Sequence, residues 1–453
     1  MTLHDTTNHA QNPPRPADLQ PAEVVGRYRA RVTHIDEAGL AHGVIVAMLV
    51  APDWAAAEAS GIESAAPLEQ ISVVGALPSE VVEVEARWRL PWPGRRRKRL
   101  RPPTLRVTRV IEAAPERVAA PCPVFGVCGG CQLQHMDYAA QLAWKTERMR
   151  ALLAEAGFID ARVQEMIGCE PPWSYRNHMR FSVDREGRAG LTARGTSRVL
   201  PLARCDIAAE RINDALTVLA RHQLPRPQAL VRYGVATGQM LLQPSPAGTL
   251  REELETLGVE LREQEFEEEL AGQRFHIRPS SFFQTNTAQA NVMARLALDA
   301  LPSGAEITLV DAYCGVGTFA RLMAERAGRV LAIEESESAV RDARANLAGA
   351  VNVEIVKGKV EEILPRLAER LDGLIIDPPR AGCQRSVLDA LIARRVPRVV
   401  YISCGPESLA RDLAILCLES GAYRLVSLQP LDMFPQTAHI ENIAILEAVE
   451  TRA

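Results

Sequence analysis

The sequence predicts an α/β protein in which a small β-barrel and an α+β middle domain precede a doubly wound C-terminal domain. Its 453 residues exceed what one hydrophobic core usually organises, so several domains are expected. Short β-favouring runs separated by Gly, Pro and polar turns fill residues 23–112, which is typical of a small barrel. After residue 277, apolar strands alternate with helical stretches, and this predicts parallel strands joined by crossover helices.

The predicted elements follow in chain order. Residues 1–22 are polar and proline-rich, so we expect a disordered tail outside the fold. An alanine-rich insertion at 51–67 and an arginine-rich one at 91–103 interrupt the barrel. In the middle domain, 113–276, hairpins in an antiparallel sheet are predicted by YRNHMRFSVD and GRAGLTARGTSRVLPL. The last domain, 277–453, contains the strand segments ITLVDAY, RVLAIE, GLIIDPPR and RVVYISCGP.

Composition and charge restrict the class of protein. No apolar run reaches the eighteen or so residues of a membrane span, and the N-terminal residues lack a basic and apolar signal. We therefore expect a soluble cytoplasmic protein, acting as a monomer and without a membrane partner. The net charge of -4 argues against a uniformly basic surface for nucleic acid. The charge is uneven, because residues 85–109 hold ten Lys or Arg and one acid, whereas 252–270 hold nine Glu and one Arg.

A nucleoside site is predicted at LVDAYCGVGTF, residues 309–319. An acid at a strand end precedes small residues that let a ligand approach the backbone, and a helix follows. Glu334 ends the next strand, where a carboxylate can accept both ribose hydroxyls. A glycine turn alone also occurs in dehydrogenases and other α/β proteins. Since neither GxGxxG nor GxxxxGK[ST] is present, a nucleoside carrying a sulfonium amino acid fits better than NAD or ATP.

These residues resemble the class I methyltransferases that bind S-adenosylmethionine. The resemblance implies that the methionine end of the cofactor contacts Asp311, Tyr313, Gly315 and Gly317. It places Glu334 on the ribose and Asp377, after the fourth strand, at the carboxyl edge of the sheet. The alternative for Asp377 is a turn former before two prolines.

Cys404 is a candidate covalent nucleophile. It follows the apolar strand RVVYI, which places the thiol at the same sheet edge as Asp377. Methylation of uracil at carbon 5 requires a thiolate to add at carbon 6, and the helix after Gly405 is expected to lower the thiol pKa. The alternative is a buried, inert cysteine. A general base must then remove the carbon 5 proton, for which Glu441 is the first candidate and His439 the second.

The chain as a whole, from about residue 23 onward, resembles the RNA uracil-5-methyltransferases. The matching motifs are SFFQTN, DAYCGVGTF, DPPRAG, SCGPESLARDL and DMFPQTAHIEN. The resemblance implies Cys404 as nucleophile, Glu441 as base and Gln284 as a cofactor contact. It implies methyl transfer to a uridine of structured RNA, with 23S rRNA favoured and the T-loop of tRNA second. Relatives often have Asn or Asp at the position of Lys359, where the side chain holds the adenine of the cofactor. We therefore do not assign an adenine contact to Lys359.

Nine cysteines, an odd number spread unevenly through a large chain expected in the cytoplasm, favour metal or catalytic use over disulfides. Cys122, Cys128 and Cys131 have C-x5-C-x2-C spacing, and Cys205 offers a fourth thiolate. Four thiolates suit zinc or an iron-sulfur cluster, and the spacing alone favours neither. The resemblance implies a [4Fe-4S] cluster, as in larger bacterial members. For the remaining thiols we expect plain packing: Cys169, Cys314, Cys383 and Cys417.

RNA contacts are expected in the first two domains. The barrel resembles a TRAM domain, an OB-like RNA-binding module. Its basic run, residues 95–101, suits phosphates, and Trp88 and Trp92 suit base stacking, although such runs are often only solvated loops. In the middle domain, SYRNHMRF matches a family motif through Arg176 and Arg180, but His178 replaces a frequent Lys.

Two alternatives belong to other functional classes. A non-catalytic RNA-binding iron-sulfur protein is disfavoured by the presence of Cys404, Glu441 and Asp377 together. A radical enzyme that cleaves S-adenosylmethionine needs an iron with an open position, whereas Cys205 would complete four ligands.

Overall fold

The computed structural model describes residues 23–54, 68–89, 103–225 and 227–450. The predicted tail, the insertion at 55–67 and most of the arginine-rich run, including Trp92, lie outside the described residues. The chain divides into two compact units, of which the first comprises Met1–Asp36 and Leu40–Ala114 and the second Glu37–Gly39 and Pro115–Ala453.

The first unit is a five-stranded antiparallel sheet with the order β3-β2-β1-β4-β5. Its strands are β1 (Glu23–Ile35), β2 (Ala41–Val50), β3 (Gln70–Val73), β4 (Val81–Arg89) and β5 (Thr104–Glu112). Every second residue of β1 between Val24 and Val32 is buried, as alternation along a half-buried strand requires. β3 and β5, at opposite ends of the strand order, also contact each other. A TRAM-like barrel stays a prediction.

Trp88 does not suit the stacking role that the sequence suggested. The side chain is only 3% exposed, and it packs edge-on against Trp54 with ring centroids 5.2 Å apart. Because its ring faces the core of the first unit, the expectation of base stacking at Trp88 is wrong.

The second unit contains the hairpin-rich sheet predicted for the middle domain. The strand order is β11-β10-β9-β6-β7-β8, antiparallel except for the β10–β11 pair. The elements of this region are β6 (His178–Val183), β7 (Ala189–Thr192), β8 (Val199–Pro201), α3 (Glu210–Leu219), β9 (Gln228–Tyr233), β10 (Gln239–Gln243), α4 (Gly248–Glu255), β11 (Glu260–Arg262), and the hairpin β12 (Phe266–Leu270) and β13 (Gln273–Ile277).

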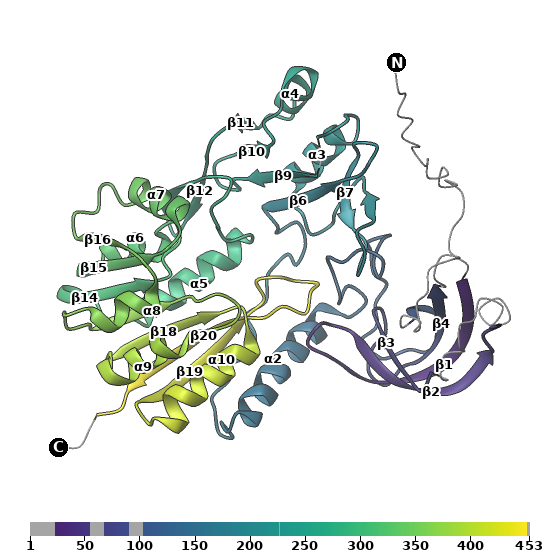
Figure 1. Ribbon diagram of the computed structural model, residues 1–453, viewed down its shortest axis with the longest axis horizontal. Helices are drawn as coiled ribbons and strands as arrows, with labels where there is room; N and C mark the ends of the chain where they lie inside the picture. The colour runs from purple at the N-terminus through teal and green to yellow at the C-terminus, as the bar shows by residue number, and fades with distance from the viewer. Residues whose placement is uncertain (1–22, 55–67, 90–102, 226, 451–453) are drawn as a thin grey trace, which may run out of the picture. The chain divides into compact units, whose positions relative to one another are not determined.

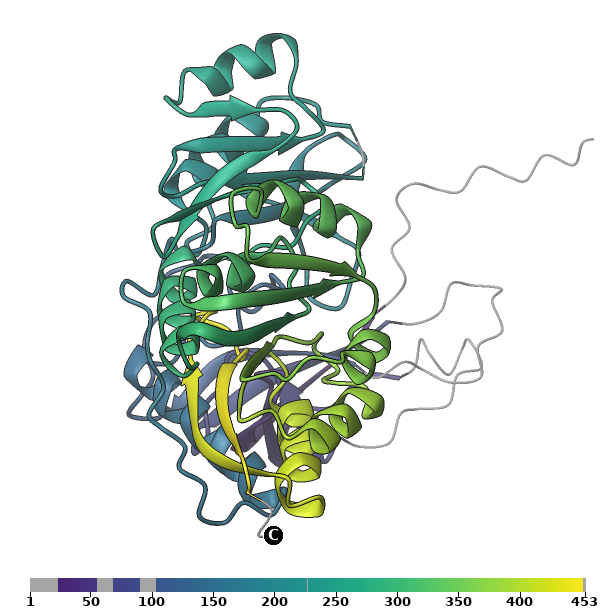
Figure 2. The same cartoon turned by 90° about the vertical axis from the view of Figure 1, so that its left-hand side faces the viewer.

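A seven-stranded sheet confirms the predicted doubly wound fold, with the order β16-β15-β14-β17-β18-β20-β19 (Figure 1). β20 runs antiparallel to both of its neighbours, β18 and β19, and the other described pairings in this sheet are parallel. The strands are β14 (Gly304–Ala312), β15 (Ala327–Glu334), β16 (Val353–Lys357), β17 (Gly373–Ile376), β18 (Arg398–Ser403), β19 (Tyr423–Leu431) and β20 (Glu441–Ala448). In Figure 2 the sheet passes from green to yellow, because β14–β16 lie on one side and β18–β20 on the other.

Helices cover both faces of this sheet. One buried cluster unites the sheet with α5 (Thr287–Asp299), α6 (Thr318–Ala324) and α7 (Glu337–Asn346). A second cluster unites the opposite face with α8 (Val360–Ile363), α9 (Arg385–Arg394) and α10 (Pro406–Leu413). Successive residues Ile375 and Ile376 belong to different clusters, as expected for a strand that is buried on both faces.

Helix α2 (Tyr138–Glu155) packs on the C-terminal sheet although its residues fall in the range predicted for the middle domain. Met149 and Leu153 are fully buried in the same cluster as Leu409 of α10. Nearby, residues 163 and 167 form parallel bridges to Leu428 and Leu431 of β19. The middle segment therefore contributes part of the core on which the C-terminal sheet rests.

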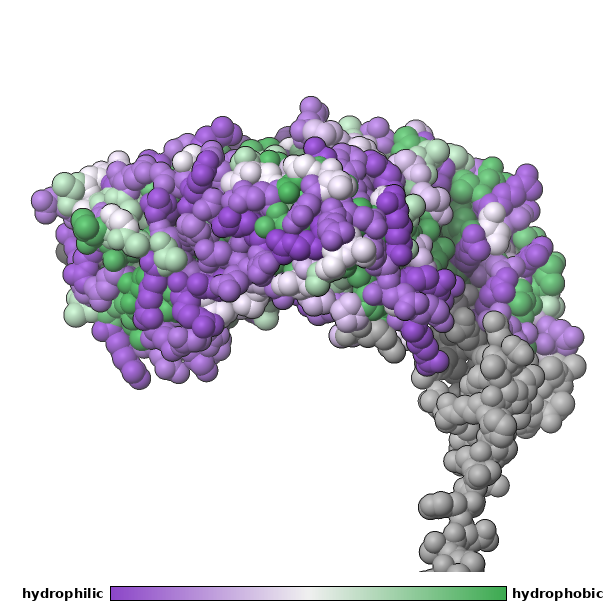
Figure 3. Space-filling view, turned by 90° about the horizontal axis from the view of Figure 1, so that it is seen from above, coloured by the Kyte–Doolittle hydropathy of each residue, from purple (hydrophilic) through white to green (hydrophobic). Residues whose placement is uncertain are grey.

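No helix in the described part of the chain has the length and apolar character to cross a membrane. The face in Figure 3 is mainly hydrophilic, with small, separate hydrophobic areas.

Candidate active site

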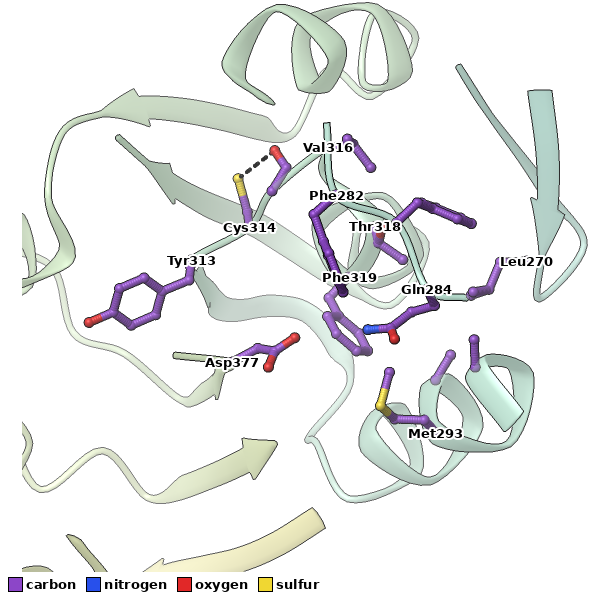
Figure 4. A pocket seen from close by; sticks show the side chains of 14 residues that line it. Leu270, Phe282, Gln284, Met293, Tyr313, Cys314, Val316, Thr318, Phe319 and Asp377 are labelled. Atoms are coloured by element: carbon purple, nitrogen blue, oxygen red, sulfur yellow. Dashed lines mark hydrogen bonds between the residues drawn. The ribbon is translucent and has the colours of Figure 1, made fainter. Parts of the chain in front are cut away.

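A pocket lies at the carboxyl ends of β14 and β17, where the strand order of the sheet reverses. Open α/β sheets bind ligands at this position. The pocket has a volume of about 50 Å³. Figure 4 shows Gln284 and Asp377 among the side chains that line it. Its lining consists of Leu270, Phe282, Phe283, Gln284, Ala290, Met293, Ala294, Tyr313, Cys314, Gly315, Val316, Thr318, Phe319 and Asp377. Of the predicted cofactor residues, Gln284, Tyr313, Gly315 and Asp377 therefore share one pocket.

The turn after β14 has the backbone conformation that the glycines predicted. Tyr313, Gly315 and Gly317 all have positive φ, at 65°, 57° and 85°. Gly317 caps α6, and a Cβ there would lie 3.0 Å from Leu347 Cδ1, whereas a Cβ on Gly315 would meet nothing within 4 Å. Gly317 is required by packing beneath the turn, and Gly315 leaves open space on the pocket side.

Glu334 ends β15 and holds this turn from the side. Its carboxylate accepts hydrogen bonds from the backbone N–H of Gly315, at 2.9 Å, and of Ser336, at 2.7 Å. The side chain ties the glycine turn to the start of α7. Its contact with a ribose stays a prediction.

Asp311 lies beneath the turn and does not belong to the pocket lining. It is fully buried, and Oδ2 accepts the N–H of Ala320 in α6 at 2.7 Å. Burial raises its pKa to about 7, with the nearby carboxyl of Asp377 adding to the rise. Asp311 therefore anchors the start of α6, and its contact with the methionine end of a cofactor stays a prediction.

Gln284 is positioned by the middle sheet. Asn177, just before β6, is buried, and its amide donates to the carbonyl of Gln284 at 3.1 Å and to Thr287 Oγ1 at 2.9 Å. The pocket wall therefore depends on contact between the two sheets of the second unit. Phe282, beside Gln284, is 69% exposed, and the sequence motif gave no reason to single it out.

Cys404 and Glu441 occupy opposing strand ends. In the antiparallel pairing of β18 with β20, Ser403 lies opposite Asn442. The next pair of opposed residues is therefore Cys404 and Glu441. Tyr401 pairs with Ile376 of β17, so Asp377 follows at the same edge. The three predicted reactive side chains are therefore brought to one edge of the sheet.

The pKa of Cys404 is raised, whereas the sequence predicted that it would be lowered. Burial raises the pKa of Cys404 to about 11, and the carboxyls of Glu441 and Asp377 add to the rise. The expected lowering by helix-terminal donors is therefore wrong, because burial and two acidic neighbours outweigh them. Burial also raises the pKa of Asp377 to about 7, and the pKa of the buried Glu441 lies well above its usual range.

Neighbouring side chains distinguish the two candidate bases. Burial lowers the pKa of His439 to about 4, with Arg380 and Lys145 contributing, so its imidazole is neutral and weakly basic. Glu441 is 5% exposed and has a raised pKa, which makes its carboxylate the stronger proton acceptor. Arg380, three residues after Asp377, is an exposed cation that lowers the pKa of Cys404 and was missed by the sequence reasoning.

The four predicted metal ligands Cys122, Cys128, Cys131 and Cys205 line a separate cavity of about 200 Å³. Burial raises the pKa of Cys131 to about 12 and of Cys205 to about 11. Within the described residues, no group of three or more His, Cys, Asp or Glu side chains is arranged to hold one metal ion. A [4Fe-4S] cluster at these thiols stays a prediction.

Arg176 and Arg180 line the same cavity as the cysteines. His178, between them, has a buried Nε2 without a hydrogen-bond partner in the described part of the chain, and burial lowers its pKa to about 3. An RNA contact by these residues stays a prediction.

Lys359 is the N-cap residue of α8, just after β16.

Comparisons with known proteins agree with this geometry. The family model described as tRNA (uracil-5-)-methyltransferase matches residues 258–449. An uncharacterized RNA methyltransferase of Halalkalibacterium halodurans is 34% identical over 396 residues, covering 76% of this chain and 86% of the relative. One from Thermosynechococcus vestitus is 35% identical over 390 residues, covering 75% and 87%.

A solved structure shares the fold of almost the whole chain. It is the tRNA (uracil-54, C5)-methyltransferase of Pyrococcus abyssi in complex with S-adenosyl-L-homocysteine. The TM-score is 0.65 at 21% identity, covering 92% of this chain and all of the other. With relatives at 34% and 35% identity along most of their length, the chain belongs to the RNA uracil-5-methyltransferase family.

Proposed function

We propose that the protein transfers a methyl group from S-adenosylmethionine to carbon 5 of a uridine in RNA, with Cys404 as nucleophile and Glu441 as base. The observation that carries this proposal is the meeting of Cys404, Glu441 and Asp377 at neighbouring strand ends, beside the pocket. A thiol, a buried carboxyl and a ligand pocket at one sheet edge match the needs of covalent methylation at a carbon atom.

The pocket residues suit S-adenosylmethionine. Gly315 has open space on its Cα, which allows a ligand to approach the backbone. Asp377 lines the pocket and is the carboxylate best placed to complement a sulfonium. Bound there, the cofactor supplies an electrophilic methyl group. Its positive charge favours the ionised forms of Asp377, Glu441 and Cys404, whose pKa values the protein alone raises.

In the proposed reaction the Cys404 thiol first gives its proton to solvent. The thiolate forms a bond between Sγ and carbon 6, and the electrons of the ring double bond move onto the carbonyl oxygen at carbon 4. Carbon 5 of this enolate takes the methyl group, and S-adenosylhomocysteine departs with the bonding pair. Glu441 then removes the proton from carbon 5, the double bond returns and the thiolate leaves.

The cysteine cavity supports a [4Fe-4S] cluster held by Cys122, Cys128, Cys131 and Cys205. Three of these thiols come from the segment 122–131 and the fourth, Cys205, from a distant one, and all four line one space with the size for several atoms. Anaerobic reconstitution followed by iron and sulfide analysis tests this assignment. Near four irons per chain supports it, and one zinc per chain contradicts it.

For the substrate we propose a uridine of 23S rRNA, recognised partly by the basic run at 95–101. A tRNA uridine is the second candidate, because the matching family model is described for tRNA enzymes. Mapping 5-methyluridine in both RNAs from a strain that lacks this protein separates them. Loss of the modification in tRNA alone would contradict the rRNA assignment.

The decisive test of the mechanism uses the thiol. Cys404→Ala is expected to lose at least about 10³-fold in kcat, since covalent activation is removed. RNA containing 5-fluorouridine is expected to trap the parent enzyme covalently, because carbon 5 then has no proton for Glu441 to remove. Turnover by Cys404→Ala at the parent rate would rule out the mechanism. Absence of tritiated methyl transfer to any RNA would instead favour a non-catalytic RNA-binding protein.

A further inference from the structure

The loop 432–440 joins β19 to β20 and ends at Glu441 (yellow in Figure 1). Three of its carbonyls accept hydrogen bonds from separate parts of the second unit. Asn286 donates to Met433 O at 3.1 Å, Lys145 to Phe434 O at 3.4 Å and Tyr175 to Pro435 O at 3.1 Å. The loop before the base is therefore held by other parts of the second unit in addition to its own hydrogen bonds, such as that of Thr437 Oγ1 to Phe434 O at 2.8 Å.

Gln436 is the strained centre of this loop. It is a non-glycine residue with a φ of 69°, and it is only 2% exposed. Its carbonyl accepts the N–H groups of Gln132 and Leu133, both at 3.0 Å. Such a conformation persists only where the surroundings hold it. Here the holding segment is the one that immediately follows Cys131.

Gln141 of α2 joins the same two segments through its side chain. It is 1% exposed, its Oε1 accepts the N–H of Gln436 at 3.2 Å, and its Nε2 donates to Gln436 Oε1 at 3.0 Å. The same Nε2 lies within hydrogen-bond distance of Leu133 O, at 3.1 Å, and Met136 O, at 2.9 Å. Gln141 thus ties the segment after the cysteines to the loop that ends at the base.

We infer that Gln141 is a positioning residue for Glu441, acting by clamping Gln436 to the segment that follows Cys131. The inference rests on the proposed function, because it assumes that Glu441 removes the carbon 5 proton. The same contacts also connect the cysteine cavity to the base, since Cys131 directly precedes Gln132 and Leu133, whose N–H groups hold Gln436. The segment that carries the cavity cysteines then helps to position Glu441 for proton removal, although none of those cysteines takes part in that step.

The position of Glu441 matters for one step in particular. Attack by Cys404 and methyl transfer come before proton removal, and the bond between Sγ and carbon 6 breaks only after it. A displaced Glu441 therefore leaves RNA covalently bound after methylation. A general loss of folding does the opposite, because it prevents the bond from forming.

The test is Gln141→Leu in the full chain, assayed with unmodified substrate RNA and S-adenosylmethionine. We expect kcat to fall about ten- to a hundredfold, as for small displacements of a catalytic group, with KM within about twofold. We also expect more RNA in covalent complex with the protein on a denaturing gel during steady-state turnover. An unchanged adduct fraction at reduced kcat would overturn the inference.

Three further variants complete the design. Leu153→Ala removes a fully buried, apolar side chain of the same helix, which makes no hydrogen bond to the loop, and it should lower the melting temperature without adduct accumulation. Gln436→Gly keeps the backbone hydrogen bonds and suits the positive φ, so it folds even if Gln141→Leu does not. It should accumulate adduct through loss of the side-chain contact alone, and failure to do so would also overturn the inference.

Glu441→Gln separates this inference from the proposed function. If it accumulates adduct and neither Gln141→Leu nor Gln436→Gly does, the clamp is wrong while the base assignment stands. If Glu441→Gln itself accumulates none, the assignment of the base fails, and the inference built on it fails with it.

Discussion

Cys404 carries a thiol whose pKa is raised to about 11, next to two carboxyls whose pKa values are also raised. In the free protein burial shifts each group toward its neutral form, and at neutral pH the Cys404 thiol is protonated. A cationic ligand in the pocket reverses this preference. Under the proposed function, we expect the Cys404 thiol to stay unreactive until a sulfonium binds, which would protect it from adventitious alkylation.

Alkylation by iodoacetamide tests the state of Cys404 directly. Because only the thiolate reacts, the rate should rise about tenfold per pH unit from pH 7 to 10 without a plateau. Glu441→Gln removes a carboxyl whose charge raises the pKa of Cys404, so it should shift this profile to lower pH. Peptide mass spectrometry distinguishes Cys404 from the other thiols. A plateau near pH 8 would contradict the raised pKa.

The buried Asp311 predicts a pH dependence of stability. Its folded pKa of about 7 exceeds its ordinary value of 3.8, so the folded state retains the proton longer than the unfolded state. The contribution of Asp311 to the free energy of unfolding is complete below about pH 4. It declines by about 1.4 kcal/mol per pH unit as the pH rises to 7. Asp311→Asn should remove this decline. Melting temperatures of both proteins between pH 5 and 8 measure it, and parallel curves would contradict it.

At the scale of elements, the turn between β14 and α6 depends on two glycines for different reasons. Gly317→Ala is expected to cost about 2 kcal/mol, because φ is unfavourable and the new Cβ meets Leu347. Gly421→Ala is a matched control, with a φ of 60° and open space around it, and should cost only about 1 kcal/mol. Denaturant unfolding gives both values. Equal costs would show that the Leu347 contact is unimportant.

Helix α2 is attached to the C-terminal sheet through a buried ion pair. Lys145 Nζ lies 2.6 Å from Asp432 Oδ1, and both side chains are fully buried. Lys145→Met should destabilise by about 3–5 kcal/mol, because Asp432 then keeps a buried charge without its partner. Adding Asp432→Asn should recover part of this loss. If the double variant is no more stable than Lys145→Met, the charge of Asp432 is not the cause.

At the scale of the whole molecule, all residues that line the candidate cofactor pocket lie in the second unit, 115–453. A chain of these residues should therefore bind S-adenosylmethionine as tightly as the full protein, measured by calorimetry. It lacks the basic run at 95–101, so its RNA affinity should depend less on salt. The slope of log affinity against log salt should decrease by about 0.7–0.9 per lost phosphate contact. An unchanged slope would exclude the basic run from RNA binding.

The sequence was most informative where periodicity and strand ends coincide. The runs ending at Ala312, Glu334, Ile376 and Ser403 are buried strands, and parallel strands bring their carboxyl ends to one edge. This is why Asp377 and Cys404 could be placed together from the sequence. It was least informative for α2, because Gln141, Lys145 and Thr146 are polar residues on its buried face, so no apolar period marks that face or the sheet that covers it.

Local pattern and chemistry determined the doubly wound domain, the glycine turn and the candidate nucleophile and base, because each depends on residues close together in the chain. The tertiary structure alone decided the pKa of Cys404, the burial of Trp88 and the clamp between Gln141 and Gln436. These three properties arise from side chains brought together across long sequence separations. Burial and charge at such contacts depend on the packing of the whole unit, which no local pattern encodes.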